Sequence, residues 1–215
     1  MSFYNKNASR DEALNFFTEE GVLTFGSFTL KSGRSSPYFF NTGSLCTGYQ
    51  LNRLGKLYAR ALHNTPLFGE ATVVFGSAYK GIPISVATVM AMEELGNDNL
   101  RAVSDRKEAK THGDVSGFLG ILERGDKAVI VDDVITTGGT KVEAIEKLRA
   151  AGCEPLGLII AFDRGEPVDE SGRTAREIFQ EQTGLEVHAL LSVHDIIDAR
   201  PDLGETLKSH LASFA

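Results

Sequence analysis

The order of apolar segments along the chain predicts an α/β protein whose mainly parallel sheet is flanked by helices. From about residue 72 onward, apolar runs of strand length alternate with longer stretches of helical periodicity. Such alternation is typical of parallel strands joined by crossover helices. The chain has 215 residues, of which 42% are hydrophobic and 24% charged, so it can form one sizeable domain with a full core. Sheets of this kind bind ligands at the carboxyl ends of their strands.

The N-terminal part differs from this alternation. Ser9 and Glu12 have the spacing of a capping box, and the apolar residues after them predict an N-terminal helix. Between residues 22 and 45, short aromatic and apolar pieces are broken by glycines and a proline, which is a pattern of short strands and turns. We expect residues 1–45 to form a small N-terminal hood within a single domain spanning residues 1–215.

The remaining segments supply the sheet and its covering layers. Helices are predicted at 9–20, 51–62, 84–95, 141–150 and 174–182, and strands at 72–75, 100–103, 127–134, 155–162 and 185–191. Two further capping signals, Ser192-x-x-Asp195 and Asp202-x-x-Glu205, predict a helical tail. Residues 104–119 interrupt the alternation, because this polar segment stands where a helix would otherwise be expected. A long polar loop in a compact domain is usually functional or disordered.

The overall charge and the two cysteines restrict the functional classes. The formal net charge is −7 and the isoelectric point is near 5.3, whereas a general nucleic-acid binder is expected to carry a basic balance or a basic face. Cys46 and Cys153 stand far apart and form no C-x-x-C motif, so we expect free thiols in a reducing compartment. The sequence has no apolar signal core and no stretch long enough for a membrane helix. We therefore expect a cytoplasmic protein that binds neither nucleic acid nor membranes.

The segment from Lys127 to Lys141 is the most informative part of the chain. An apolar run ends in Asp132 and Asp133, a Thr/Gly loop follows at 136–140, and a helical pattern then begins. Backbone N–H groups in a glycine-rich turn and in the first turn of a helix attract a phosphate. The two acids cannot bind that phosphate, but they suit the hydroxyls of a sugar or a metal ion bound to one. The segment therefore predicts a site for a phosphorylated sugar.

Two better-known phosphate-binding motifs are absent from this segment. Its glycines do not supply the G-x-x-x-x-G-K-[ST] string of a P-loop, and the dinucleotide fingerprint G-x-G-x-x-G is missing. A purely structural alternative is a solvated strand end followed by a turn. For an isolated pair of acids before glycines, the functional and structural interpretations have about equal weight.

Positive charge is concentrated in the polar segment 104–119. Arg106, Lys107, Lys110 and His112 are four donors that suit a polyphosphate whose charge grows as it departs. Flanking glycines suit a lid that closes and excludes water. Acids are interleaved with these residues, so a solvated charge run is the simpler alternative, and composition alone favours it.

Five strings together resemble one enzyme family. The Lys127–Lys141 segment is similar to the PRPP-binding loop of the type I phosphoribosyltransferases. Four strings are similar to segments of the orotate phosphoribosyltransferases: F-T-L-K-S-G-R-S-S-P-Y-F-F-N at 28–41, F-G-S-A-Y-K-G-I-P at 75–83, R-K-E-A-K-T-H-G at 106–113 and A-F-D-R at 161–164. Ser77 stands where many relatives have proline. The resemblance extends over about residues 10–195 and implies the type I phosphoribosyltransferase fold, with 104–119 as a flexible catalytic loop.

The resemblance implies a reaction and its cofactor. PRPP and orotate would give orotidine 5′-monophosphate and pyrophosphate, in de novo pyrimidine (UMP) biosynthesis. Mg2+ would be held mainly by PRPP and water, with Asp132 or Asp133 as the candidate protein ligands. The family also implies a homodimer in which Lys107 reaches into the neighbouring subunit's site.

The resemblance assigns roles to individual residues. Those implied in catalysis are Lys107, Lys110, His112, Asp132 and Asp133. Those implied in PRPP binding are Lys31, Tyr79, Lys80, Arg106, Lys107, Lys110, His112, Asp132, Asp133, Val134, Ile135, Thr136, Thr137, Gly138, Gly139 and Thr140. Those implied in orotate binding are Lys31, Phe39, Phe40, Thr136 and Arg164, the last through its guanidinium fork. Without the resemblance, Phe39 and Phe40 as core and Arg164 as a surface ion pair with Asp163 are the simpler interpretations.

Two other functions remain open at this point. A non-catalytic, PRPP-sensing regulator would be expected to carry a DNA-binding domain or a basic face, and it could lose the catalytic loop. This chain is acidic and keeps the four cationic residues between Arg106 and His112. A purine phosphoribosyltransferase would share the PRPP loop but not the strings at 28–41 and 106–113.

Overall fold

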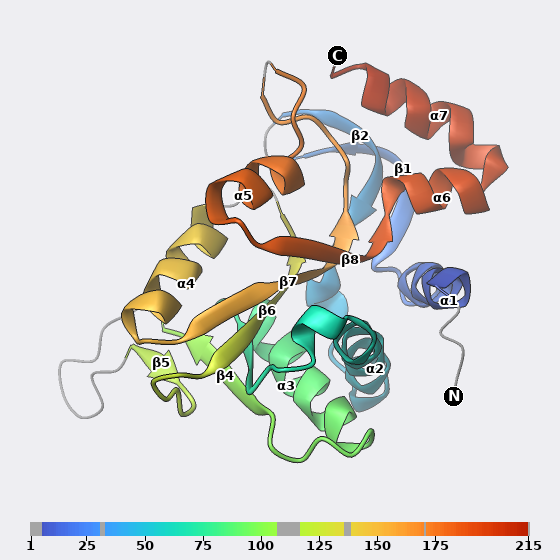
Figure 1. The fold of residues 1–215 in the computed structure, drawn as a ribbon. Coiled ribbons are helices and arrows are strands. Elements are labelled where there is room, and N and C mark those ends of the chain that lie inside the picture. Colours follow the sequence, from blue (N-terminus) through green and yellow to red (C-terminus); the bar gives the residue numbers. More distant parts are fainter. Residues whose placement is uncertain (1–5, 31–32, 107–116, 136–138, 170, 215) are drawn as a thin grey trace.

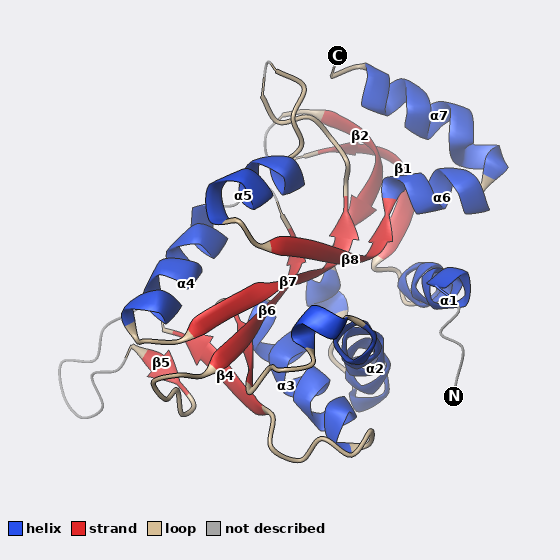
Figure 2. Ribbon diagram, viewed as in Figure 1, coloured by secondary structure: helices blue, strands red, loops and turns tan. Residues whose placement is uncertain are grey.

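A six-stranded sheet forms the centre of the molecule (Figures 1 and 2), as seen in a computed structural model that describes residues 6–30, 33–106, 117–135, 139–169 and 171–214. The strand order is β5-β4-β3-β6-β7-β8. The strands are β3 (Val73–Gly76), β4 (Arg101–Asp105), β5 (Phe118–Leu119), β6 (Lys127–Val134), β7 (Glu154–Asp163) and β8 (Glu186–Ser192). Among them only the short β5 runs antiparallel to its neighbour. The predicted α/β class with a mainly parallel sheet is confirmed.

Helices cover both faces of this sheet (Figure 1). One layer contains α1 (Lys6–Glu19), α2 (Gly48–Asn64) and α3 (Gly81–Glu93), and the other contains α4 (Gly139–Ala150) and α5 (Ala175–Thr183). Two short helices end the described chain, α6 (Val193–Ala199) and α7 (Pro201–Ala212), and short 3-10 turns lie at Thr42–Ser44 and Pro66–Phe68. No helix of the described residues is both long and apolar enough to cross a membrane.

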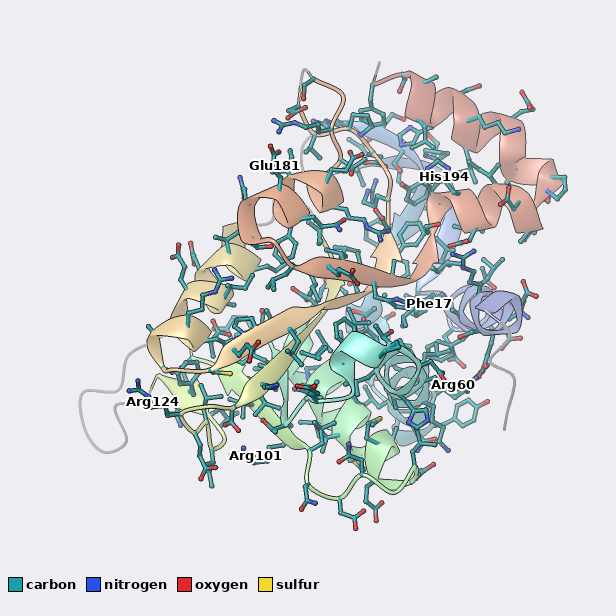
Figure 3. The ribbon with its side chains drawn as sticks, viewed as in Figure 1. Phe17, Arg60, Arg101, Arg124, Glu181 and His194 are labelled. Atoms are coloured by element: carbon teal, nitrogen blue, oxygen red, sulfur yellow. The ribbon has the colours of Figure 1, made fainter. Side chains whose placement is uncertain are left out.

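The alternation of side chains along β6 separates two hydrophobic cores. Val129 and Val131 pack in the core under α1, α2 and α3, whereas Ala128 and Ile130 pack in the core under α4 and α5. Successive residues of a strand point to opposite faces of the sheet, so a strand buried on both faces is apolar throughout. Phe17 of α1, which is fully buried, fills the first core (Figure 3).

The N-terminal hairpin forms a separate two-stranded sheet. Its strands are β1 (Leu23–Thr29) and β2 (Ser35–Phe40), which pair antiparallel. Tyr38 and Phe40 point toward Phe162 of β7, with ring centroids 5.5 and 4.9 Å away. Helix α7 lies against β2 (Figure 1), so the C-terminal helix and the N-terminal hairpin meet beside the end of β7.

Some predicted helix boundaries are wrong. The capping box at Ser192 and Asp195 is present, but the one predicted at Asp202 is not, because α7 begins at Pro201. Proline suits the first position of a helix, since its φ is preset and its missing N–H has no partner there. Helix α1 begins at Lys6, before the predicted capping box, and α4 begins at Gly139 rather than at Lys141.

Candidate active site at the carboxyl end of the sheet

The carboxyl ends of four parallel strands bring the described candidate residues to one edge of the sheet. Asp132 and Asp133 lie at the end of β6, and Lys80 follows the end of β3. Arg106 follows β4, and Arg164 follows β7. Strand pairing aligns these ends, because Gly76 of β3 lies opposite Val131 of β6 and Ser104 of β4. Lys31, Lys107, Lys110, His112, Thr136, Thr137 and Gly138 are outside the described residues.

Asp132 forms a buried ion pair with a lysine of α4. The Nζ atom of Lys141 lies 2.6 Å from Oδ2 of Asp132, and their side chains are only 6% and 12% exposed. Burial raises the pKa of Asp132 above its usual range, while the charge and hydrogen bond of Lys141 act in the opposite direction. Lys141 is absent from the predicted binding residues. Its only sequence signal is its place at the end of the Thr/Gly loop.

Asp133 forms the corresponding pair on the opposite side of the sheet. The Nζ atom of Lys80, just before α3, lies 2.6 Å from Oδ2 of Asp133. Asp133 is 7% exposed but Lys80 is 47% exposed. The Lys80 side chain therefore stays partly in water. Its ammonium group can leave Asp133 for another anion with little further loss of hydration.

Hydrogen bonds fix the backbone at the end of β6. The hydroxyl of Tyr58, a fully buried residue of α2, donates to the carbonyl oxygen of Asp132 at 2.8 Å. The backbone N–H of Asp133 donates to Oδ1 of Asp132 at 2.8 Å, and that of Val134 donates to Oδ1 of Asp133 at 2.9 Å. Burial, followed by the negative charges of Asp133 and Asp132, raises the pKa of Tyr58 well above its usual value. The hydroxyl therefore stays protonated and remains a donor.

The start of α4 comes soon after the end of β6 in the chain. Helix α4 begins at Gly139, so Gly139 and Thr140 belong to its first turn, and both are exposed. N–H groups in the first turn of a helix lack intrahelical partners and carry partial positive charge. Val134 ends the strand, and Ile135, the next residue, is buried. This arrangement can hold an anion close to the two acids.

The turn between β3 and α3 requires glycine at two positions. A Cβ atom on Gly76 would lie 2.1 Å from the carbonyl oxygen of Gly81, and one on Gly81 would lie 2.8 Å from that of Val131. The close approach places Lys80 directly beside the end of β6. The Ser77 hydroxyl is buried and has no hydrogen-bond partner in the described part of the chain. Tyr79 is 69% exposed.

Arg106 and Asp105 lie at the end of β4. The Nε atom of Arg106 donates to the carbonyl oxygen of Phe118 at 3.0 Å, which ties the base of the 104–119 segment to β5. Asp105 accepts from the backbone N–H of Ala78 at 2.8 Å and from Nζ of Lys147 at 3.1 Å. These contacts join the ends of β3 and β4 to α4.

Arg164 forms an ion pair that differs from the one expected. Its Nε and Nη2 atoms donate to Glu166 at 3.1 and 2.6 Å, while Asp163 pairs with Arg176 instead. The interpretation of Arg164 as a surface partner of Asp163 is wrong, since its side chain is only 16% exposed. The guanidinium edge formed by Nε and Nη2 is thus already occupied. Glu166 has no sequence signal beyond its place two residues after Arg164.

The two adjacent phenylalanines differ in burial. Phe40 belongs to the core, where it stacks on Phe162 and meets Phe17 edge to face at 5.1 Å. Phe39 is 42% exposed and leans on Phe28, with ring centroids 5.7 Å apart. The core interpretation therefore holds for Phe40 and fails for Phe39.

The acids at this edge do not form a metal cage by themselves. Within the ranges that the structure describes, no group of three or more His, Cys, Asp and Glu residues could hold a metal ion. Asp132 and Asp133 are two adjacent carboxylates, each with a lysine partner. This donor set fits a hydrated magnesium ion whose remaining ligands come from a phosphorylated substrate and water.

Comparisons with known proteins agree with this geometry. The family model of the phosphoribosyl transferase domain matches residues 49–192. Orotate phosphoribosyltransferase of Methylococcus capsulatus is 45% identical over 82% of this chain and 81% of its own length. That of Agathobacter rectalis is 40% identical over 95% of each chain. A crystal structure of orotate phosphoribosyltransferase from Francisella tularensis superposes with a TM-score of 0.81 at 30% identity, covering 92% of this chain and 96% of that one. The chain therefore belongs to the phosphoribosyltransferase family and, within it, to the orotate phosphoribosyltransferases.

Proposed function

We propose that this chain transfers the phosphoribosyl group of PRPP to orotate, giving orotidine 5′-monophosphate and pyrophosphate in de novo pyrimidine biosynthesis. One observation carries the proposal. Two acids, two lysines and the start of a helix lie together at the end of β6, and a partly buried arginine follows the neighbouring strand β7. The first group suits a phosphorylated sugar, and the arginine suits an anionic base.

The PRPP side of the reaction uses the end of β6. The 5′-phosphate is held by N–H and hydroxyl groups of residues 136–140, and the ribose hydroxyls by Asp132 and Asp133, with Val134 and Ile135 shaping the loop. The bond between C1′ and the pyrophosphate oxygen breaks, and its electron pair leaves with pyrophosphate. The orotate nitrogen supplies the pair for the new bond to C1′, and its proton is released to water or to the departing pyrophosphate. Catalysis then depends on holding the two reactants in line and stabilising the departing charge.

Cationic groups take up the charge of the departing pyrophosphate. Lys80 can exchange Asp133 for a pyrophosphate oxygen because its side chain is about half exposed. Arg106, Lys107, Lys110, His112 and Tyr79 serve the same leaving group, as the family resemblance implies. Bound magnesium would add charge neutralisation between these oxygens, held mainly by PRPP and water with Asp132 or Asp133 as the protein ligand.

The base is recognised on the side of Arg164. Lys31, Thr136 and the backbone of Phe39 and Phe40 complete this pocket in the proposal. A carboxylated pyrimidine needs cations and N–H donors at its edge, and the partly buried guanidinium of Arg164 supplies both. Arg164 is therefore the residue that selects an anionic base over a neutral one.

A homodimer with Lys107 acting in the partner's site completes the proposal. Val86 and Met90, one turn apart on α3, are 46% and 65% exposed, which suits an apolar face covered by a second copy. Mixed dimers of Lys107→Ala and Asp133→Asn subunits should regain activity if the lysine acts across the interface. Confirmed heterodimers without activity would contradict that arrangement. Cys46 and Cys153 are free thiols, which supports a cytoplasmic location.

The orotate assay tests the central proposal. Purified protein should consume orotate, followed by its absorbance, only when PRPP and magnesium are both present. Parallel reactions with adenine, guanine and hypoxanthine test the purine alternative. No loss of orotate would leave the regulatory alternative, which binds PRPP without turnover, and activity on a purine would replace orotate as the acceptor.

A further inference from the structure

Glu166 is a buried carboxylate to which the proposed reaction gives no part. Its side chain is 8% exposed and accepts four hydrogen bonds. Tyr38 donates through its hydroxyl at 2.7 Å, and Nε2 of His210 lies 3.0 Å away. The other two bonds come from Arg164. We name Glu166, Arg164, Tyr38 and His210 the Glu166 cluster.

The Glu166 cluster joins three distant parts of the chain. Tyr38 belongs to β2 of the N-terminal hairpin, Arg164 and Glu166 follow β7, and His210 belongs to α7. Figure 1 shows α7 beside the hairpin, where it packs against β2. The ring of His210 meets those of Tyr38 and Phe214 edge to face, at 5.9 and 5.0 Å. The C-terminal helix therefore reaches Glu166, the carboxylate that pairs with the residue proposed to recognise the base.

Arg164 is held from more than one side. Glu166 occupies the edge formed by Nε and Nη2, the ring of Tyr38 lies 4.8 Å from Cζ, and the Ser36 hydroxyl lies 3.4 Å from Nη2. A guanidinium group has five N–H donors. Within the described residues, Nη1 donates to no acceptor. The Nη1 side is thus the part of the group left for a ligand.

A substrate carboxylate is not expected to displace Glu166 from this position. Burial by itself would raise the pKa of Glu166, but hydrogen bonds from Arg164, Tyr38 and His210 and the charge of Arg164 outweigh it, so the pKa lies below its usual value. The carboxylate is therefore ionised, and leaving its donors would strand it unpaired and buried. An unpaired buried charge is strongly destabilising.

We infer that Glu166, supported by His210 of the C-terminal helix, is a positioning residue for base recognition. It fixes the orientation of Arg164 so that the Nη1 side meets the anionic base. His210 donates its Nε2–H to the carboxylate, which accepts only, and thereby couples α7 to the pocket. The inference rests on the proposed function, because it takes the carboxylated base as the partner of Arg164.

A double-mutant cycle tests whether Glu166 acts through Arg164. Glu166→Gln should raise the KM for orotate about tenfold while the KM for PRPP stays within about twofold, since a charge-assisted hydrogen bond is lost. In an Arg164→Ala background the same change should add less than about twofold, because coupled residues are not additive. Additive effects, or an equal rise in both KM values, would overturn the inference.

Two further variants test the inference even if Glu166→Gln fails to fold. His210→Ala keeps the pair of Glu166 with Arg164 and should raise the KM for orotate about threefold, by loss of one supporting hydrogen bond. Asp202→Asn is the matched control on the same helix. It breaks the exposed pair of Asp202 with Arg200 and should leave the KM for orotate unchanged. If His210→Ala and Asp202→Asn have the same KM for orotate, the inferred role of α7 in positioning Arg164 is wrong.

A substrate-free measurement separates this inference from the proposed function. The 15N-labelled Nε–H group of Arg164, assigned by its absence in Arg164→Ala, should exchange slowly with water in the wild type and rapidly in Glu166→Gln. Slow exchange in a protein that does not consume orotate would defeat the proposed function alone. Rapid exchange in a wild type that does consume orotate would defeat the positioning role alone.

Discussion

Asp132 and Asp133 are neighbours in the chain, yet their carboxylates have different surroundings. Each has a lysine at 2.6 Å. Lys141 is buried to the same degree as its acid, whereas Lys80 keeps nearly half of its side chain in water. The pair of Asp132 and Lys141 lies between the sheet and the start of α4. The pair of Asp133 and Lys80 lies at the turn just before α3.

The difference follows from the pleat of the strand. Successive side chains of β6 point to opposite faces, so the two acids meet helices from different layers. Lys141 lies in the first turn of α4 and is buried, while Lys80 directly precedes α3 and is half exposed. Two identical residues thereby become different groups: Asp132 is internally neutralised and fixed, and Asp133 is paired with a cation that can leave.

The largest effect is expected from removing the buried lysine. Lys141→Met leaves Asp132 without its cation in a buried position and should lower the free energy of unfolding by about 3–5 kcal/mol. Urea unfolding measures the loss. The double variant Asp132→Asn, Lys141→Met removes both charges and should recover most of it. A Lys141→Met protein as stable as the wild type would show that the pair is not closed to water.

The pH dependence of the same variant sharpens the test. Burial already raises the pKa of Asp132, and loss of Lys141 should raise it further. An acid with a higher pKa in the folded state binds more protons when folded, so stability falls as pH rises from the ordinary value of 3.8 through the folded pKa. Lys141→Met should therefore lose least stability in mild acid and most near neutrality.

Removing Lys80, the more exposed lysine, should reduce activity strongly and stability only slightly. Lys80→Met should lower the free energy of unfolding by clearly less than Lys141→Met does, because Lys80 is half exposed and water can take its place beside Asp133. It should lower kcat/KM by about a hundredfold, since a donor to the leaving group is lost. Urea unfolding and the orotate assay measure the two quantities. A loss of stability as large as that of Lys141→Met would contradict the claim that the two ion pairs differ in their contribution to stability.

An effect smaller than the loss of stability in Lys141→Met and the loss of activity in Lys80→Met is expected at the backbone between the two acids. Tyr58→Phe removes the hydroxyl that donates to the carbonyl oxygen of Asp132 and should cost about 1–2 kcal/mol of stability. Activity should fall together with stability, because the end of β6 carries both Asp132 and Asp133 with their lysine partners. Urea unfolding and turnover of the variant check this. A stable but inactive variant would place Tyr58 in substrate binding instead.

The positions of the main strands, and their alternation with helices along the chain, were largely predictable from the sequence. The strand predicted at 127–134 matches β6 at both ends; its centre is a continuous apolar run, which the strand extends through the two acids to Val134. Helix starts were less predictable: Lys80 caps α3 without a side-chain hydrogen bond, so no capping signal marks it. The predicted residues that the structure describes at the ends of β3, β4, β6 and β7 lie at one edge of the sheet.

The contacts between side chains of different elements were not predictable. Lys141 and Glu166 carry no motif of their own, and each lies beside residues that the sequence analysis did single out. Tyr38 and Glu166 are 128 residues apart, and His210 is 44 residues from Glu166. No local pattern records which of several arginines and acids will meet over such separations.

The sequence alone determined the class of the fold, the two acids at a strand end and the family, because each depends on periodicity or on a contiguous string. The tertiary structure decided what those strings do to one another. It paired one acid with a buried lysine and the other with an exposed one, and it turned the fork of Arg164 toward Glu166. The physical reason is that such pairings depend on strand order and helix packing, which bring together side chains far apart in the chain.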